Sequence, residues 1–266
     1  MRSLAHSHVA WNLDTKDMRA AALRMLALVL LLPVAHGQKG TTLELHKAAA
    51  SNNVDKLREL LAAGASVETE GAYKGTLLHS AAENGHLEAI QALMAAGASV
   101  DALNLGQHTP LQVAAMNGHA KAIQALVAAG ASTEANADGF TTLHLAVMMG
   151  QTEVIRALVA AGAGLEARNN DNHTPLHMAA FTGHTDAVQV LVAAGASIEA
   201  QTDGMRTPLH WAASRGHAET VKALLAAGAS IKARTDDMRT PLQLAAAAGN
   251  AEVIMVLELA DSKDEL

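Results

Sequence analysis

The sequence predicts an all-α repeat solenoid of about seven helix-turn-helix units, including caps, joined by hairpin-like loops. A Leu-His-x-Ala-Ala motif, first seen at Leu45 and His46, returns in varied form about every 33 residues to the end of the chain. A fixed period of this length is typical of stacked supersecondary units. Only 2% of the residues are aromatic, so Leu, Val, Ile and Ala must fill the core. Because one such unit buries too little apolar surface alone, neighbouring units are expected to share a continuous core.

Each unit is expected to begin with one short helix. In four units a Thr-Pro pair precedes the motif Leu, where Thr suits the N-cap and Pro suits the first helical turn. These pairs begin at Thr109, Thr174, Thr207 and Thr240. A Gly-His pair such as Gly183-His184 then predicts the end of the helix, because Gly takes the left-handed conformation that closes it.

A second helix follows in each unit and ends at an Ala-Ala-Gly-Ala sequence. About a dozen polar residues then lead to the next unit, and Asp-Gly pairs at Asp138 and Asp203 predict turns within them. The repeat domain is predicted to span residues 38–260. Its helix pairs are predicted at residues 42–64, 76–97, 109–130, 141–162, 174–195, 207–228 and 240–260.

These motifs resemble the ankyrin repeat. Thr-Pro-Leu-His, Ala-Ala-x-x-Gly-His and the terminal Gly-Ala are the signature of that family, and they cover residues 42–260. The resemblance implies a binding module whose first helices line a concave surface that the hairpin tips extend. Local departures are Gln112 and Gln243 in place of His, Leu77 and Thr142 in place of Pro, and Asn52 in place of Gly. They are expected to affect local stability and not the fold.

The first 37 residues lie outside the repeats and have the layout of a secretory signal peptide. Met25–Ala35 is apolar but, at 11 residues, is shorter than the roughly 20 that a membrane span needs. Basic residues precede it, and the small-x-small sequence Ala35-His36-Gly37 predicts cleavage before Gln38. The start is either Met1 or Met18. The alternatives are an uncleaved signal anchor and a buried helix.

Residues 261–266 are predicted to form a tail that ends in Lys263, Asp264, Glu265 and Leu266. This tetrapeptide is the retrieval signal of the endoplasmic reticulum, which a lumenal receptor reads. Because the leader offers entry to the lumen, we expect lumenal localisation, with the retrieval receptor as a partner at the C-terminus. The alternative is a cytoplasmic chain in which both terminal sequences are coincidental.

Asn172-His173-Thr174 is a possible glycosylation site on a loop tip. The favoured alternative is that Asn172 is a turn residue in the left-handed conformation, which Asn tolerates.

Composition and motifs argue against catalysis and against nucleic-acid binding. The chain has a net charge of −7, and without the four basic and two acidic residues of 1–37 it keeps 15 basic and 24 acidic residues, a net charge of −9. A phosphate-binding basic stripe is missing from the sequence, so nucleic acid is not an expected partner. The 14 His residues mostly occupy repeat positions, where we expect them to bond the backbone and not a metal. Without a phosphate loop, a nucleophile elbow or a His-Glu-x-x-His motif, the chain is predicted to be non-catalytic and to need no cofactor.

A partner is expected on one face of the first helices, formed by the residue after each motif His and the two residues before each Gly. In the middle units this face is rich in Met, which is flexible and common on surfaces that accept varied partners. The candidate contact residues are Met116, Met148, Met149, Met178, Phe181, Trp211 and Arg215, with Phe140, Met205 and Met238 in the hairpin loops. The alternative for the residue after each His, which includes Met178 and Trp211, is packing against the next unit.

We therefore expect an adaptor or holdase-like protein that binds an extended apolar segment of a lumenal client through a concave, Met-rich face. The alternatives are an inhibitor or regulatory subunit of one lumenal enzyme, and a cytosolic scaffold. The mature chain is expected to be a monomer without a membrane span.

Overall fold

The computed structural model describes residues 39–137 and 139–264, with the side chains of Lys39, Lys263 and Asp264 left out. The predicted leader and the last two residues of the predicted retrieval signal lie outside the described residues. The chain divides into the units Met1–Gly40 and Thr41–Leu266, and the following description concerns the second.

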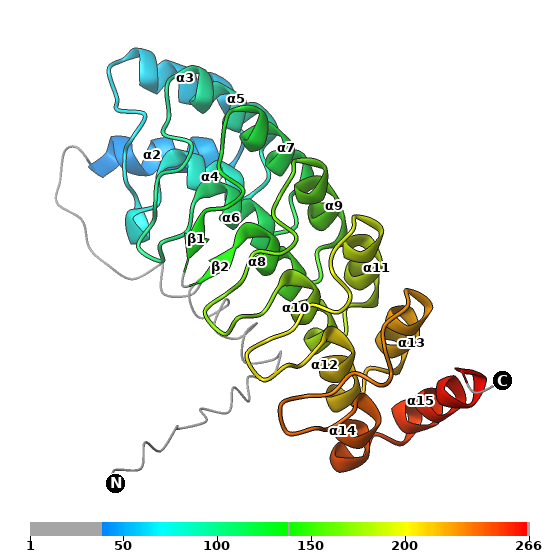
Figure 1. The fold of residues 1–266 in the computed structure, drawn as a ribbon. Coiled ribbons are helices and arrows are strands. Elements are labelled where there is room, and N and C mark those ends of the chain that lie inside the picture. Colours follow the sequence, from blue (N-terminus) through cyan, green and yellow to red (C-terminus); the bar gives the residue numbers. More distant parts are fainter. Residues whose placement is uncertain (1–38, 138, 265–266) are drawn as a thin grey trace, which may run out of the picture. The chain divides into compact units, whose positions relative to one another are not determined.

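Paired helices make up this unit, stacked one pair after another (Figure 1). The first helices of the pairs are α2 (Lys39–Ala50), α4 (Leu77–Glu83), α6 (Pro110–Met116), α8 (Thr142–Met148), α10 (Pro175–Thr182), α12 (Pro208–Arg215) and α14 (Pro241–Ala248). The second helices are α3 (Val54–Ala62), α5 (Leu87–Ala95), α7 (Ala120–Ala128), α9 (Thr152–Ala160), α11 (Thr185–Ala193), α13 (Ala218–Ala226) and α15 (Ala251–Asp264).

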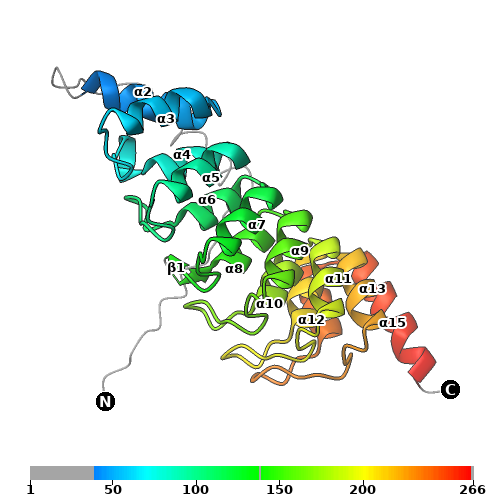
Figure 2. The ribbon, with the colours of Figure 1, turned by 90° about the horizontal axis from the view of Figure 1, so that it is seen from above.

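The loops between pairs project to one side of the stack (Figure 2). One of them contains the short 3-10 helix η1 (Ala72–Lys74). Another contains two antiparallel strands, β1 (Asn136–Ala137) and β2 (Phe140–Thr141), in which Ala137 pairs with Phe140. The loops are therefore the hairpin-like connections that the turn residues predict.

From α3 onward each helix contacts its counterpart in the next pair, so α10 lies between α8 and α12, and α11 lies between α9 and α13. The motif Leu residues Leu78, Leu111, Leu143, Leu176 and Leu209 are all fully buried. The motif Ala residues beside them, such as Ala179 and Ala180, are also fully buried and let neighbouring helices approach closely. The fold class predicted from the repeat, an all-α solenoid, is confirmed.

The predicted caps and stops form as local chemistry requires. Thr174 accepts a hydrogen bond from the backbone N–H of His177 at the start of α10, and Pro175 occupies the first turn. Gly183 ends the same helix in the left-handed conformation, with φ of 76°. In α12, Thr207 is the N-cap, with its backbone N–H donating to His210 Nδ1, and Gly216 ends the helix in the left-handed conformation with φ of 79°.

The two outer boundaries differ from the predicted ones. Helix α2 begins at Lys39, and α15 continues to Asp264 instead of ending at residue 260. No Gly or Pro follows Ala260 to stop α15, and Leu257 anchors it by burial (2% exposed). The predicted tail is thus helical as far as Asp264. Among the described residues, no helix is long and apolar enough to cross a membrane.

Candidate functional site

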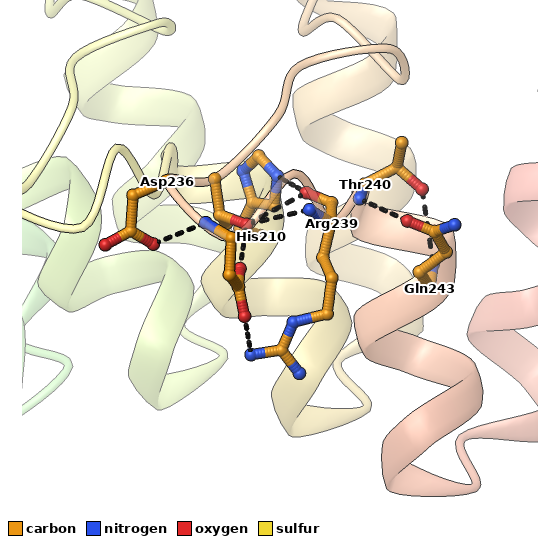
Figure 3. Close-up of polar contacts among 7 residues, drawn as sticks. His210, Asp236, Arg239, Thr240 and Gln243 are labelled. Carbon is orange, nitrogen blue, oxygen red and sulfur yellow. Dashed lines mark hydrogen bonds and ion pairs between the residues drawn. The ribbon is translucent and has the colours of Figure 1, made fainter.

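Buried histidines join four of the repeats to the repeat that follows. The Nε2–H of His79, His144, His177 and His210 donates to a backbone carbonyl 29 residues later, at 3.0 to 3.2 Å. The Nδ1 of the same ring accepts the backbone N–H of the helix-capping Thr, as His177 does from Thr174. Figure 3 shows His210 directed at the backbone of Arg239, and Gln243 in the equivalent position of the next unit, where its Oε1 accepts from the N–H of Thr240.

Burial lowers the pKa of these four histidines, and for His177 to about 4. The neutral ring keeps both hydrogen bonds, one as a donor and one as an acceptor. The prediction that the repeat histidines bond the backbone is therefore confirmed. Among the described residues, no three His, Cys, Asp or Glu side chains gather as a metal site would require.

A second set of histidines fixes the backbone of the candidate face. His184 donates from Nε2 to the carbonyl of Met148 at 3.3 Å, and His217 donates to the carbonyl of Phe181 at 3.0 Å. His86 and His119 make the same bond earlier in the stack, to Ala50 and Glu83. The next repeat thus holds in place the ends of the first helices, where the candidate residues lie.

The candidate residues on the first helices differ in exposure. Met149 is 39% exposed, and Met116, Met148 and Phe181 are half-buried. Met178 is only 8% exposed and therefore offers little surface to a partner. We call the set Met116, Met148, Met149, Phe181, Trp211 and Arg215 the first-helix face.

Burial of Met178 follows from its place in the repeat. Val113, Leu145 and Leu244 occupy the same position and are 5 to 8% exposed, so this position packs against the neighbouring units, as the alternative interpretation holds. Trp211 shares the position but is half-buried.

Aromatic rings and arginines form a row at the C-terminal part of the first-helix face. The rings of Phe181 and Trp211 meet edge to face, with centroids 5.5 Å apart. The guanidinium of Arg215 lies over Phe181, 4.0 Å from the ring centroid, and that of Arg206 lies over Trp211 at 4.9 Å. His173 meets the Trp211 ring at 5.0 Å from the hairpin side. Sequence reasoning missed Arg206, because it precedes the Thr-Pro pair in a loop.

The hairpin candidates are separate from one another. Phe140 lies in β2, half-buried and edge-on to the ring of His144 at 6.1 Å. Met205 and Met238 are 44% and 61% exposed at loop tips, with φ of 54° and 63°. On α15, outside every predicted site, Met255 and Leu259 are 57% and 63% exposed. Their spacing of four residues on a helix was the signal that could have found them.

The geometry of Asn172 fits a turn residue in the left-handed conformation. Its φ is 61°, its Oδ1 accepts from Arg168 at 2.8 Å, and its Nδ2 donates to Asp203. Because Nδ2 is the atom that carries sugar in a glycosylated Asn, the turn occupies the same atom that glycosylation would use. Glycosylation of Asn172 stays a prediction.

The described residues form a repeat solenoid with a partly apolar face, and its repeat histidines have a structural role. This combination is typical of protein-protein interaction modules. A family model of ankyrin repeats, in three copies, matches residues 18–104, 45–137, 78–169, 130–202 and 200–264. The chain belongs to the ankyrin repeat family, whose members are typically non-catalytic interaction modules.

Solved structures agree with this family. The ankyrin repeat domain of human ASB11 is similar with a TM-score of 0.72 and 30% identity, over 81% of this chain and 96% of that one. The ankyrin repeat domain of Bcl-3, described as a unique member of the IkappaB protein family, is similar with a TM-score of 0.72 and 28% identity, over 81% and 97% of the two chains. No similar curated protein sequence was found.

Proposed function

We propose that the chain is an adaptor or holdase-like protein of the endoplasmic reticulum lumen, and that it binds an extended apolar segment of a client protein through the first-helix face. One observation carries the choice of face. In the positions just before each Gly, the second unit has Glu83 and Asn84, whereas the middle units have Met148, Met149 and Phe181. Because the same fold accepts polar residues there, the core does not require the apolar ones.

The apolar residues on the face also suit the proposed ligand. Met side chains adapt to varied shapes, and aromatic side chains dominate the energetics of many interfaces. The backbone carbonyls of Met148 and Phe181 are held by His184 and His217, so the face is preorganised. Preorganisation lowers the entropic cost of binding.

The test of the face is the double substitution Met148→Glu with Phe181→Glu. We expect it to abolish cross-linking of the chain to its client while leaving the helical circular dichroism spectrum unchanged, since both side chains are only half-buried. Leu259→Glu, at a 63% exposed position on α15, is the matched control and is expected to leave the client bound. An unchanged client profile in a folded double variant would refute the proposed face.

The stoichiometry of the same cross-linked complexes separates the alternatives. Many substoichiometric clients favour the holdase, whereas one partner at fixed stoichiometry favours an inhibitor or regulatory subunit of one lumenal enzyme.

The proposed compartment rests on the two terminal sequences. We expect the intact chain to be retained in cells, and a chain whose C-terminus is masked by added residues to be secreted with a new N-terminus at Gln38. N-terminal sequencing of the secreted product checks both signals. If both forms stay cytosolic and begin at Met1 or Met18, the cytosolic scaffold is the correct alternative.

A further inference from the structure

We propose that Arg206 and Arg215 form a carboxylate-binding site beside Phe181 and Trp211, and that this site takes an aspartate or glutamate side chain of the bound protein segment. The site rests on the proposed function, because it lies on the first-helix face and would fix the register of a segment that crosses it.

Two neighbouring helices and one loop bring the four side chains together. Trp211 and Arg215 are four residues apart on α12 and therefore share a side of that helix. Phe181 comes from α10, which packs against α12, and Arg206 comes from the loop just before α12. Each guanidinium lies over one ring, at 4.9 Å for Arg206 on Trp211 and 4.0 Å for Arg215 on Phe181. The ring faces hold both cations in place through cation–π attraction.

Neither cation forms an ion pair with a described residue. Within residues 39–137 and 139–264, Arg156 and Arg239 pair with Glu153 and Asp237, but neither Arg206 nor Arg215 pairs with a carboxylate. Burial and then the positive charge of Arg206 lower the pKa of Arg215, so the two guanidiniums repel each other. Asp203 and Asp171 act on the nearby His173, but Asp203 is already bonded to Asn172. A ligand carboxylate would supply the missing charge.

Trp211 adds an unused neutral donor. Its Nε1–H is buried and has no acceptor among the described residues. A buried donor without an acceptor is unfavourable, but this N–H is covered by the protein, so a ligand oxygen gains from the pairing only where a neighbouring side chain moves aside. Two guanidiniums and one indole N–H offer the donors that a carboxylate can accept from, and charge-assisted bonds of this kind are the stronger ones.

The charge of the chain favours a peptide carboxylate over a polyanion. With a net charge of −7, the chain repels a nucleic acid along most of its length, whereas one carboxylate meets only the local arginine pair. The apolar side chains of Met148, Met149 and Phe181 lie earlier on the same face. The fitting ligand is therefore an extended segment with an acidic residue a short distance from apolar ones.

The experiment uses the full chain with Trp11→Phe, so that Trp211 is its sole tryptophan and its fluorescence reports on the site. Peptides are selected from a phage-displayed library of random dodecapeptides, and the tightest binder is synthesised with its acidic residue intact and as the corresponding amide. Binding of both peptides is measured for the Trp11→Phe chain and for Arg206→Gln, Arg215→Gln and the double variant. Arg156→Gln, on α9 and away from the first-helix face, is the matched control.

We expect the selected peptides to contain an acidic residue, the double variant to bind the acidic peptide about tenfold or more weakly, and the amide peptide to bind both chains alike. Equal affinity of the acidic peptide for the Trp11→Phe chain and the double variant would overturn the carboxylate site, while sensitivity to Met148→Glu with Phe181→Glu would still uphold the proposed face. Insensitivity to those two substitutions would instead overturn the proposed function. Tighter binding of a single-stranded oligonucleotide at Trp211 would also overturn the proposal.

Discussion

At the scale of single residues, the hairpin tips carry a backbone conformation that L residues adopt at a cost. Lys74, Gln107, Asn172, Met205 and Met238 stand at equivalent tips with φ between 54° and 63°, and Gly139 stands at the sixth. Asn172 is compensated by its hydrogen bonds, but the exposed side chains of the two methionines are not bonded. Since the left-handed conformation costs roughly 1–2 kcal/mol for such a residue, stability alone does not explain Met at these tips. Residual strain of this kind is often associated with function.

Met238→Gly is therefore expected to stabilise the protein. Relief of the left-handed strain exceeds the extra unfolded-state entropy of Gly, so the free energy of unfolding should rise by about 0.5–1 kcal/mol. Urea denaturation followed by circular dichroism measures it. Met238→Ala keeps the strain and removes most of the side chain, so it should show no such gain. Equal stability of all three chains would mean that the tip is relaxed.

Exposure was the property of single residues that the sequence predicted least well. The residue after each motif His or Gln is apolar in five units. Four of these residues are buried in the common core, namely Val113, Leu145, Met178 and Leu244, whereas Trp211 stays half-buried. By contrast, the positions before each Gly are apolar only in some units, which indicates a role particular to them. Met178 is buried because the neighbouring units cover its position, and no single unit carries that information.

At the scale of helices, the sequence can predict caps, because caps are local chemistry. Thr at the N-cap and Pro in the first turn set the start of α10, α12 and α14, and a Gly sets the end of each helix. The row from Arg206 to Arg215 could not be predicted in the same way. Its members come from a loop and from two helices whose contact depends on the packing of whole units.

The capping histidine gives a prediction at this scale. His177→Ala removes the acceptor for the N–H of Thr174 and the donor to Arg206, so the free energy of unfolding should fall by about 2 kcal/mol. His177→Gln should cost less than half as much. Gln112 makes the two equivalent hydrogen bonds in the third unit. Its Oε1 accepts from the N–H of Thr109 and its Nε2 donates to the carbonyl of Ala135, both at 3.0 Å. Chemical denaturation of the three chains compares them, and equal losses for Ala and Gln would contradict this account of the cap.

At the scale of the whole stack, the capping histidines couple four units to the units that follow them by the same bond. Each carries an acceptor nitrogen toward its own cap and a donor toward the following loop. Protonation would turn the acceptor into a second donor facing the backbone N–H of the Thr. A change in pH therefore acts on several interfaces between units at once, and not on one local site.

Stability is expected to fall as the pH falls below the ordinary histidine pKa of 6.5. The folded pKa of His177 is lowered to about 4, chiefly by burial, so the unfolded chain binds more protons between these values and acid favours it. This one residue should cost about 2 kcal/mol between pH 7.5 and pH 5. His79, His144 and His210 shift in the same direction and add to the loss. Urea denaturation at the two pH values measures the effect, and His177→Gln should make the dependence shallower, since Gln does not titrate. A free energy of unfolding that is equal at both pH values would contradict the lowered histidine pKa values.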